Sequence, residues 1–134
     1  MRTSQRKTSI PRHSLPRSFQ GVKIEKSTFL YVSFDYSDLR NSGIYESKMN
    51  DGSFSEVSAK NFSIHSTNLA GTSFKGTMLS SLSLKMSEIG DIYISEDARE
   101  LRGAKLDVSQ AMDAAKLLGI QIVNRMFALF QFTL

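Results

Sequence analysis

The chain has 134 residues, of which 40% are hydrophobic and 22% are charged, a balance that fits one folded domain rather than a disordered chain. Its 17 Lys and Arg residues against 13 Asp and Glu residues give a formal charge of +4, which by itself suggests a nucleic-acid or membrane-surface partner. The sequence contains no Cys, which excludes disulfides, thiolate metal sites and cysteine nucleophiles. No apolar run reaches the ~20 residues that a transmembrane helix needs.

The positive charge is concentrated at the start of the chain. Residues 1–18 hold five basic residues and no acidic one, which leaves 12 basic and 13 acidic residues, a net charge of −1, for the remainder. Both prolines also lie there, and the segment lacks apolar periodicity, so we predict a basic disordered tail over residues 1–18. An acid-free segment rich in Arg and Ser also fits an organelle-targeting sequence, and a wrongly assigned start is a third interpretation.

Residues 19–106 follow a period of five. Fifteen successive positions, stepping by five from Ile24 to Ile94, are all apolar, which at a background of 40% has a chance of about one in a million. The residue two places earlier in each repeat is never charged, and nine of these fifteen residues are Ser, Thr or Gly.

A period of five restricts the fold. In an α-helix it leaves no apolar face, and in a flat strand successive apolar residues would alternate between faces. An antiparallel meander does not explain fifteen steps in one frame. One side stays inward only if the chain turns a corner in every repeat, which predicts a coil of short straight sides with two inward residues per side.

If four sides make one coil, residues twenty apart stack, and about four coils follow. The predicted core columns contain matching apolar residues: Ile24, Ile44, Ile64 and Leu84 in one; Phe34, Phe54, Phe74 and Ile94 in another; Phe29, Met49, Leu69 and Ile89 in a third; Leu39, Ala59 and Leu79 in the fourth. A column of the smaller set, Ser27, Ser47, Thr67 and Ser87, predicts a ladder of buried hydroxyl groups.

Three repeats carry a family resemblance: Ser37-Asp38-Leu39, residues 67–71 (TNLAG) and residues 72–76 (TSFKG). They resemble the A(D/N)LXX units of the pentapeptide-repeat family. The resemblance covers residues 22–106 and implies an all-β fold, a right-handed, quadrilateral parallel β-helix. The frame shifts once, since Leu101 and Leu106 resume the spacing two residues late, so we expect a bulge or small loop near residues 95–98.

A short capping α-helix is predicted after the repeats, within a C-terminal segment 107–134. Asp107 and Gln110 form a capping-box pattern, and Gly119 is placed to end the helix. We expect one apolar helix face, with Ser109, Gln110, Asp113 and Lys116 opposite it; the apolar face consists of Val108, Ala111, Met112, Ala115 and Leu118.

Residues 101–106 (LRGAKL) are followed by Gln110-Ala111 and by residues 117–120 (LLGI). Together these residues resemble the C-terminal cap of the quinolone-resistance, gyrase-binding branch of the family. This resemblance implies that Met112, Ala115 and Leu118 close the last coil or join two subunits. A cap without dimerisation stays an equal alternative, because any solenoid must cover its last coil. Residues 120–123 alternate like a short strand, and the apolar residues of 124–134 are expected to pack against the cap, in a dimer seam or on a partner.

The sequence offers little for catalysis. His13 lies in the tail, His65 is expected on the surface, and outward carboxylates such as Asp35 and Asp38 are expected to be solvated. No phosphate-binding, zinc-protease or nucleophile-elbow motif occurs. We therefore predict a non-enzymatic protein without cofactor or metal, located in the cytoplasm unless the basic tail directs it to an organelle.

Three binding functions follow. Asp51 and Asp91 on one corner and Glu56 and Glu96 on the next predict an acidic stripe, diluted by Lys48, Lys60, Lys75 and Lys85. The resemblance then implies a DNA mimic that binds DNA gyrase or another topoisomerase, of the quinolone-resistance or toxin-immunity type. The alternative is a scaffold or adaptor for another protein, for which outward Leu30, Tyr31 and Tyr36 offer an apolar site. The third is DNA binding by the basic tail, since the folded body is not expected to bind nucleic acid directly or to enter a membrane.

Overall fold

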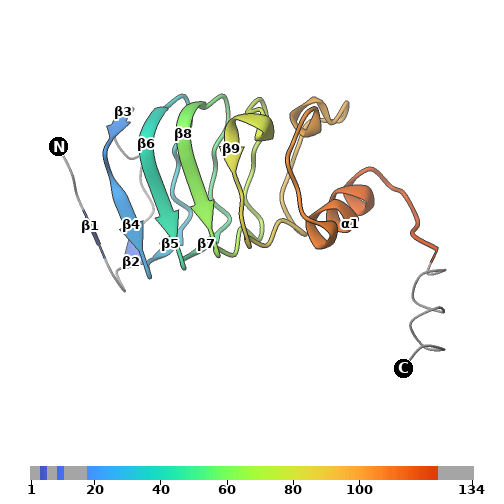
Figure 1. Cartoon of the computed structure of the whole chain (residues 1–134), viewed down its shortest axis with the longest axis horizontal. Coiled ribbons are helices and arrows are strands. Elements are labelled where there is room, and N and C mark those ends of the chain that lie inside the picture. Colours follow the sequence, from blue (N-terminus) through green and yellow to red (C-terminus); the bar gives the residue numbers. More distant parts are fainter. Residues whose placement is uncertain (1–3, 6–8, 11–17, 124–134) are drawn as a thin grey trace.

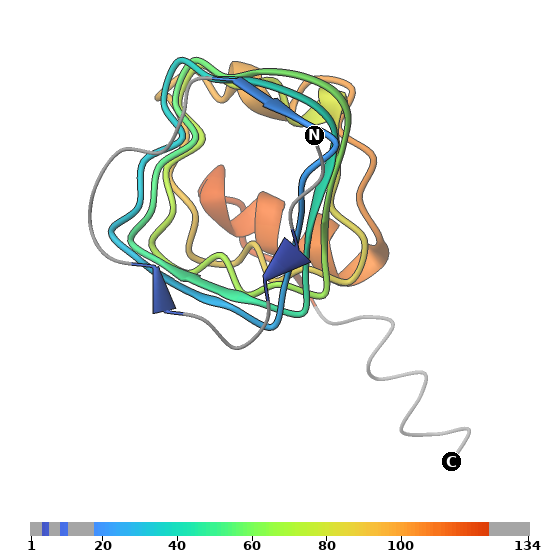
Figure 2. The ribbon, with the colours of Figure 1, turned by 90° about the vertical axis from the view of Figure 1, so that its left-hand side faces the viewer.

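The computed structural model describes residues 4–5, 9–10 and 18–123, and these form a four-sided parallel solenoid closed at one end by a helix (Figure 1). Viewed from its N-terminal end, the backbone traces nearly superimposed square coils (Figure 2). The predicted parallel β-helix is therefore confirmed.

Hydrogen-bonded strands form two sheets that together cover three sides of the solenoid, since the longer strands turn a corner at Asn41 and Asn61. On one sheet β1 (Ser4–Gln5), β4 (Lys23–Glu25), β6 (Asp38–Tyr45), β8 (Ser58–His65) and β9 (Leu82–Ser83) follow one another, and β3 (Ser18–Gln20) also pairs with β6. On the other sheet β2 (Ser9–Ile10), β5 (Thr28–Leu30) and β7 (Lys48–Asn50) stack. Ile24 pairs with Ile44 and Ile44 with Ile64, so the predicted offset of twenty residues is the register of the ladder.

β1 and β2 extend this ladder before the first predicted repeat. Ser4 pairs with Lys23 and Ser9 with Thr28, an offset of nineteen rather than twenty residues. The expectation of a disordered tail is therefore wrong for these four residues, because the first coil offers unpaired backbone groups that another strand satisfies. The rest of the predicted tail, up to residue 17, lies outside the described residues, and Ser18 belongs to β3.

The predicted core columns lie inside the solenoid. Of the eight residues in the Ile24 and Phe34 columns, seven are buried and Ile94, on the last coil, is only partly buried. Phe19 is buried as well, so the frame begins one repeat before Ile24. The rings of Phe34 and Phe54 stack with centroids 4.6 Å apart, and those of Phe54 and Phe74 with centroids 5.2 Å apart.

The predicted hydroxyl ladder exists, but it bonds to the backbone. The Ser27 N–H donates to Ser47 Oγ, the Ser47 N–H to Thr67 Oγ1 and the Thr67 N–H to Ser87 Oγ. Each hydroxyl in turn donates to a backbone carbonyl, as Ser47 Oγ does to Tyr45 O at 2.8 Å. The small polar residues of this column thus link one coil to the next.

Left-handed backbone marks the corners of the coils. Among the residues that the structure describes, eleven other than glycine have positive φ, and most lie two places after a core residue, as Tyr36, Glu56 and Met86 do. Their side chains point outward, so the corners hold outward side chains of any chemical type at the cost of local backbone strain.

The frame shift occurs where expected. After Ile94 the chain makes a short loop, in which Ala98 has φ 53°, and enters the 3-10 helix η2 (Arg99–Leu101), which contacts the earlier 3-10 helix η1 (Leu79–Ser81). Leu101 and Leu106 are partly buried against the core.

Helix α1 (Val108–Leu117) begins and ends as predicted. Both hydrogen bonds of the capping box between Asp107 and Gln110 are present, and Gly119 has φ +78°. The bonds from Gly119 N–H to Lys116 O and from Ile120 N–H to Ala115 O close the helix in a Schellman motif.

The predicted packing face of α1 is wrong. Gln110 and Ala114 are the buried residues, whereas Val108, Met112 and Leu118 are 79%, 41% and 51% exposed, and Ala115 is half-buried. Gln110 Nε2 donates to Leu84 O and Ser87 O, at 2.7 and 2.8 Å. The helix covers an open β-edge, and backbone carbonyls need a polar side chain there rather than an apolar one.

The segment after α1 also differs from its prediction. Residues 120–123 form no strand and are exposed, and the predicted apolar tail 124–134 lies outside the described residues. No helix in the described part of the chain combines the length and hydropathy needed to cross a bilayer.

Candidate functional site

The four predicted acidic residues lie exposed along two neighbouring corners of the solenoid. Asp51 and Glu56 flank the side whose inward residue is Phe54, and both have left-handed backbone. Asp91 and Glu96 flank the same side on the last coil. Parallel bridges from Ser33 to Ser53, Ser53 to Ser73 and Ser73 to Tyr93 hold this side in one register.

Two glycines make room for the carboxylates of the middle coils. A β-carbon on Gly71 would collide with Oδ1 of Asp51, and one on Gly76 would collide with the carboxylate of Glu56. Each carboxylate therefore lies along its corner column, over a residue without a side chain. Both glycines also have positive φ, +71° and +80°, so replacement by any other residue would strain the backbone as well.

Asp35 belongs to the same side, although the sequence suggested only solvation for it. It is half-buried, and its Oδ1 accepts hydrogen bonds from Ser53 Oγ at 2.5 Å and from the Ser55 N–H at 2.8 Å. Ser53 Oγ and Ser55 Oγ lie 3.1 Å apart, and Ser55 Oγ lies 3.4 Å from Ser73 Oγ. These bonds fix one carboxylate and a row of hydroxyl groups on the surface.

We define the acidic face as Asp35, Asp51, Glu56, Asp91, Glu96 and the single cation Lys75. Five carboxylates against one ammonium group give it a net charge of −4. The other lysines expected to dilute it lie on different sides: Lys48 in β7, Lys60 in β8 and Lys85 two residues after the end of β9. Residues 19–134 have nearly equal numbers of acidic and basic side chains, but the coil geometry places them on different sides.

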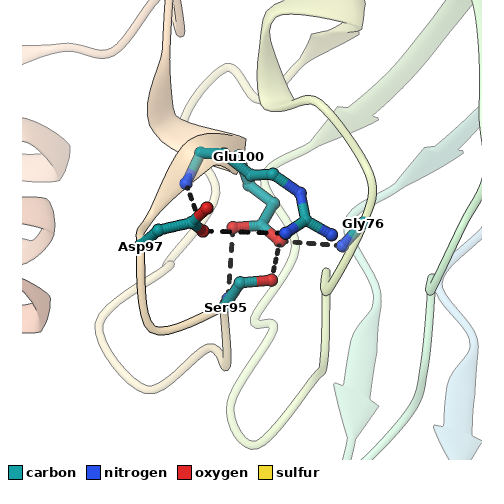
Figure 3. A network of polar contacts seen from close by, with 5 residues as sticks. Gly76, Ser95, Asp97 and Glu100 are labelled. Atoms are coloured by element: carbon teal, nitrogen blue, oxygen red, sulfur yellow. Dashed lines mark hydrogen bonds and ion pairs between the residues drawn. The ribbon is translucent and has the colours of Figure 1, made fainter.

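Glu100 is the one fully buried carboxylate among the described residues, and no pattern in the sequence predicts it (Figure 3). It accepts hydrogen bonds from Gly76 N–H at 2.8 Å, Ser95 N–H at 3.1 Å and Ser95 Oγ at 2.6 Å. In the preceding coils the equivalent donors Tyr36 and Glu56 bond to the backbone carbonyls of Ser55 and Lys75. Glu100 therefore replaces a carbonyl that the frame shift removes.

The hydrogen bonds determine the charge state of Glu100. Burial raises its pKa, but the bonds from Gly76, the Ser95 hydroxyl and the backbone N–H groups of Glu100 and Ser95 outweigh this and leave the pKa below its usual value. Its neighbours Asp97 and Arg99 form an exposed ion pair with 3.7 Å between Oδ1 and Nη1.

The described residues hold no metal-binding cluster. No group of three or more His, Asp or Glu side chains among them is arranged to hold a metal ion. His65, which we expected to be exposed, is half-buried with its ring packed edge-on against Tyr45 at 6.0 Å. The acidic face is accordingly the main candidate for function.

Comparison with solved structures identifies the fold. The crystal structure of Rfr23, a pentapeptide-repeat protein from the cyanobacterium Cyanothece 51142, superimposes with a TM-score of 0.50 over 78% of this chain and 64% of that protein, at 11% sequence identity. The chain has the pentapeptide-repeat fold. It spans less than two thirds of Rfr23.

Other comparisons add less. Full-length QnrB1, a plasmid-mediated fluoroquinolone resistance protein, is 16% identical over 87% of this chain and 100% of that protein, but its TM-score of 0.34 is too low to support an argument about function. No known protein family and no curated protein matches the sequence. The pentapeptide-repeat assignment therefore rests on the repeat, the coil geometry and the Rfr23 superposition.

Proposed function

We propose that this protein is a non-enzymatic binding module that presents its acidic face to a cationic groove on a protein partner. The observation that carries the proposal is the separation of charge: one side has a net charge of −4, while residues 19–134 together have −1. Such a face attracts a basic surface and repels nucleic acid.

The partner to test first is DNA gyrase, whose own ligand is a polyanion. The C-terminal segment resembles the gyrase-binding branch of the family, which supports this choice. Four coils at a spacing of about 4.8 Å place the net charge of −4 over about 14 Å, or one charge per 3 to 4 Å. Duplex DNA carries one per about 1.7 Å, so the face would be a weaker competitor than DNA of equal length.

Two tyrosines support binding to a protein surface. Tyr31 and Tyr36 are 55% and 68% exposed and stand at the N-terminal ends of the two acidic columns. Tyrosine is enriched at protein interfaces, where it combines apolar area with a polar hydroxyl. The face therefore offers both electrostatic steering and apolar contact.

A gyrase supercoiling assay, with and without a quinolone, tests the proposal. The full chain should alter supercoiling or drug inhibition at concentrations up to about 50 µM. Asp51→Asn combined with Glu56→Gln should weaken the effect at least about fivefold. The matched control, Asp38→Asn with Glu46→Gln, removes two charges from other sides and should change little. No effect of the wild-type chain, with or without drug, would exclude gyrase.

A scaffold or adaptor function is the second candidate, favoured by exposed Leu30 beside Tyr31 on the first coil. In this case a cross-linked complex with a specific partner other than a topoisomerase should form in the cell. It should be lost in Leu30→Ser and retained in the Asp51→Asn, Glu56→Gln variant. The reverse dependence would favour the acidic face.

A further inference from the structure

A groove lies between the last complete coil and the cap, on the side opposite the acidic face. It has a volume of about 720 Å³. Residues on its two walls include Leu84, Lys85 and Met86 from the coil and Lys105, Leu106 and Gln110 from the cap.

The groove exists because the repeat omits one ladder step here. In earlier coils a corner N–H donates to the next coil, as Glu46 does to His65 O and Ser66 does to Lys85 O, both at 2.9 Å. The same rule would pair Met86 N–H with Lys105 O. Within the described part of the chain neither Met86 N–H nor Leu84 N–H donates a hydrogen bond, and Gln110 bonds to the carbonyls of Leu84 and Ser87 rather than to these N–H groups.

The edge beside β9 therefore presents two backbone donors to an open groove. Unpaired donors beside a strand are a template for an added strand. The alternation of the coil also defines the side chains of such a strand: Ser83 is outward, Leu84 is inward and buried, and Lys85 is outward and exposed.

We propose that this groove binds an extended segment of another protein by strand addition to residues 84–86. The segment would carry a small polar residue over Ser83, an apolar residue between Leu84 and Leu106, and a carboxylate over Lys85. Lys105, on the opposite wall and exposed, adds a second positive charge for that carboxylate. Cross-strand pairs of opposite charge and of apolar residues are the interactions that stabilise such pairing.

The probe is an acetylated octapeptide with Ser-Ile-Glu at its centre, and its control has Lys in place of Glu. The full chain should bind the Glu peptide with a dissociation constant below about 1 mM by fluorescence anisotropy. NMR hydrogen exchange should show the amides of Leu84 and Met86 slowed about tenfold or more when the peptide is bound.

Charge reversal tests the register. Lys85→Glu should weaken binding of the Glu peptide by about two- to fivefold and strengthen binding of the Lys peptide by a similar factor. Lys48→Glu, on a neighbouring side, is the matched control and should change neither. The proposal is overturned by no saturable binding at 1 mM, by binding without protection of these two amides, or by unchanged preference in Lys85→Glu. None of these results bears on the proposed function of the acidic face, since that face lies on the other side of the solenoid.

Discussion

Stacked core residues carry the stability of each coil. Phe54 is fully buried between Phe34 and Phe74, and its ring is within 7° of parallel to both. Phe54→Ala should lower the free energy of unfolding by about 3–5 kcal/mol, measured in urea, because it opens a cavity within the column. Tyr93→Ala, at a 59% exposed aromatic residue of the same side, is the control and should cost less than about 1 kcal/mol. Equal effects of the two substitutions would contradict the column.

Glu100 should make stability dependent on pH. Its pKa is lowered in the folded protein from an ordinary value of 4.5, so its contribution is present above pH 4.5 and is lost as the pH falls through the lower folded pKa. Glu100→Ala should cost about 1–3 kcal/mol at pH 7 because the N–H groups of Gly76 and Ser95 lose their acceptor.

Urea unfolding at a series of pH values between 7 and 3 measures this effect. Glu100→Gln should remove part of the acid sensitivity, whereas Glu96→Gln, an exposed carboxylate close by, should retain it. Glu56 places a second carboxylate beside Gly76, so the same series in Glu56→Gln serves as a further control. An unchanged profile in Glu100→Gln would show that this carboxylate does not stabilise the fold.

Residues that follow the repeat could be predicted, and residues that depart from it could not. Ile44 and Phe54 were placed inside because every repeat supplies an independent copy of the same pattern. Glu100 follows the frame shift, where the five-residue pattern is interrupted and no longer predicts which residues point inward. Asp35 looked like any outward carboxylate, since its partners Ser53 and Ser55 are identified only once the coils are stacked.

The boundaries of α1 depend on local interactions and could be predicted. Its orientation depends on the surface beneath it and could not. Asp107, Gln110 and Gly119 define the start and end through hydrogen bonds within the helix and its caps. Which face packs depends on the surface beneath, and an apolar stripe is a poor guide when that surface is an edge of carbonyls. The strands β1 and β2 could not be predicted, because each has only two residues and pairs with residues nineteen rather than twenty positions later.

Gln110 should hold the cap in place. Gln110→Leu keeps much of the side-chain volume but removes the bonds to Leu84 O and Ser87 O, which should cost about 1–3 kcal/mol. Urea unfolding monitored by circular dichroism measures the change, and Ser109→Leu, at an exposed neighbouring position, is the control. If Gln110→Leu is as stable as the wild type, α1 is held mainly by its apolar contacts.

The outer surface of α1 is the proposed dimer surface. Met112 and Leu118 are exposed, as are Ile120 and Ile122 beyond the helix, and we expect this surface to join two subunits. Light scattering should then give about 30 kDa, twice the 15.0 kDa of the chain. Met112→Asp combined with Leu118→Asp should halve that mass. The control is Met78→Asp, at the N-cap of η1, where the side chain is 38% exposed; it should leave the mass unchanged. A wild-type mass near 15 kDa would show that the helix caps without dimerising.

Opposite sides of the solenoid carry different chemistry because the coil sorts residues by their position in the repeat. The net charge of +4 gave no hint of this, since the first eighteen residues supply five positive charges and the acidic face has −4. The proposed cationic partner and the proposed added strand would therefore meet opposite sides of the solenoid.

The left-handed corners separate the surface of this protein from its core. A corner side chain takes no part in the columns, so its identity can change while the ladder keeps coils about 4.8 Å apart. Charged side chains in one corner column are therefore separated by whole multiples of the coil spacing. A series of variants with carboxylates moved one coil at a time would measure the charge pattern of a partner groove directly, at a resolution set by the backbone.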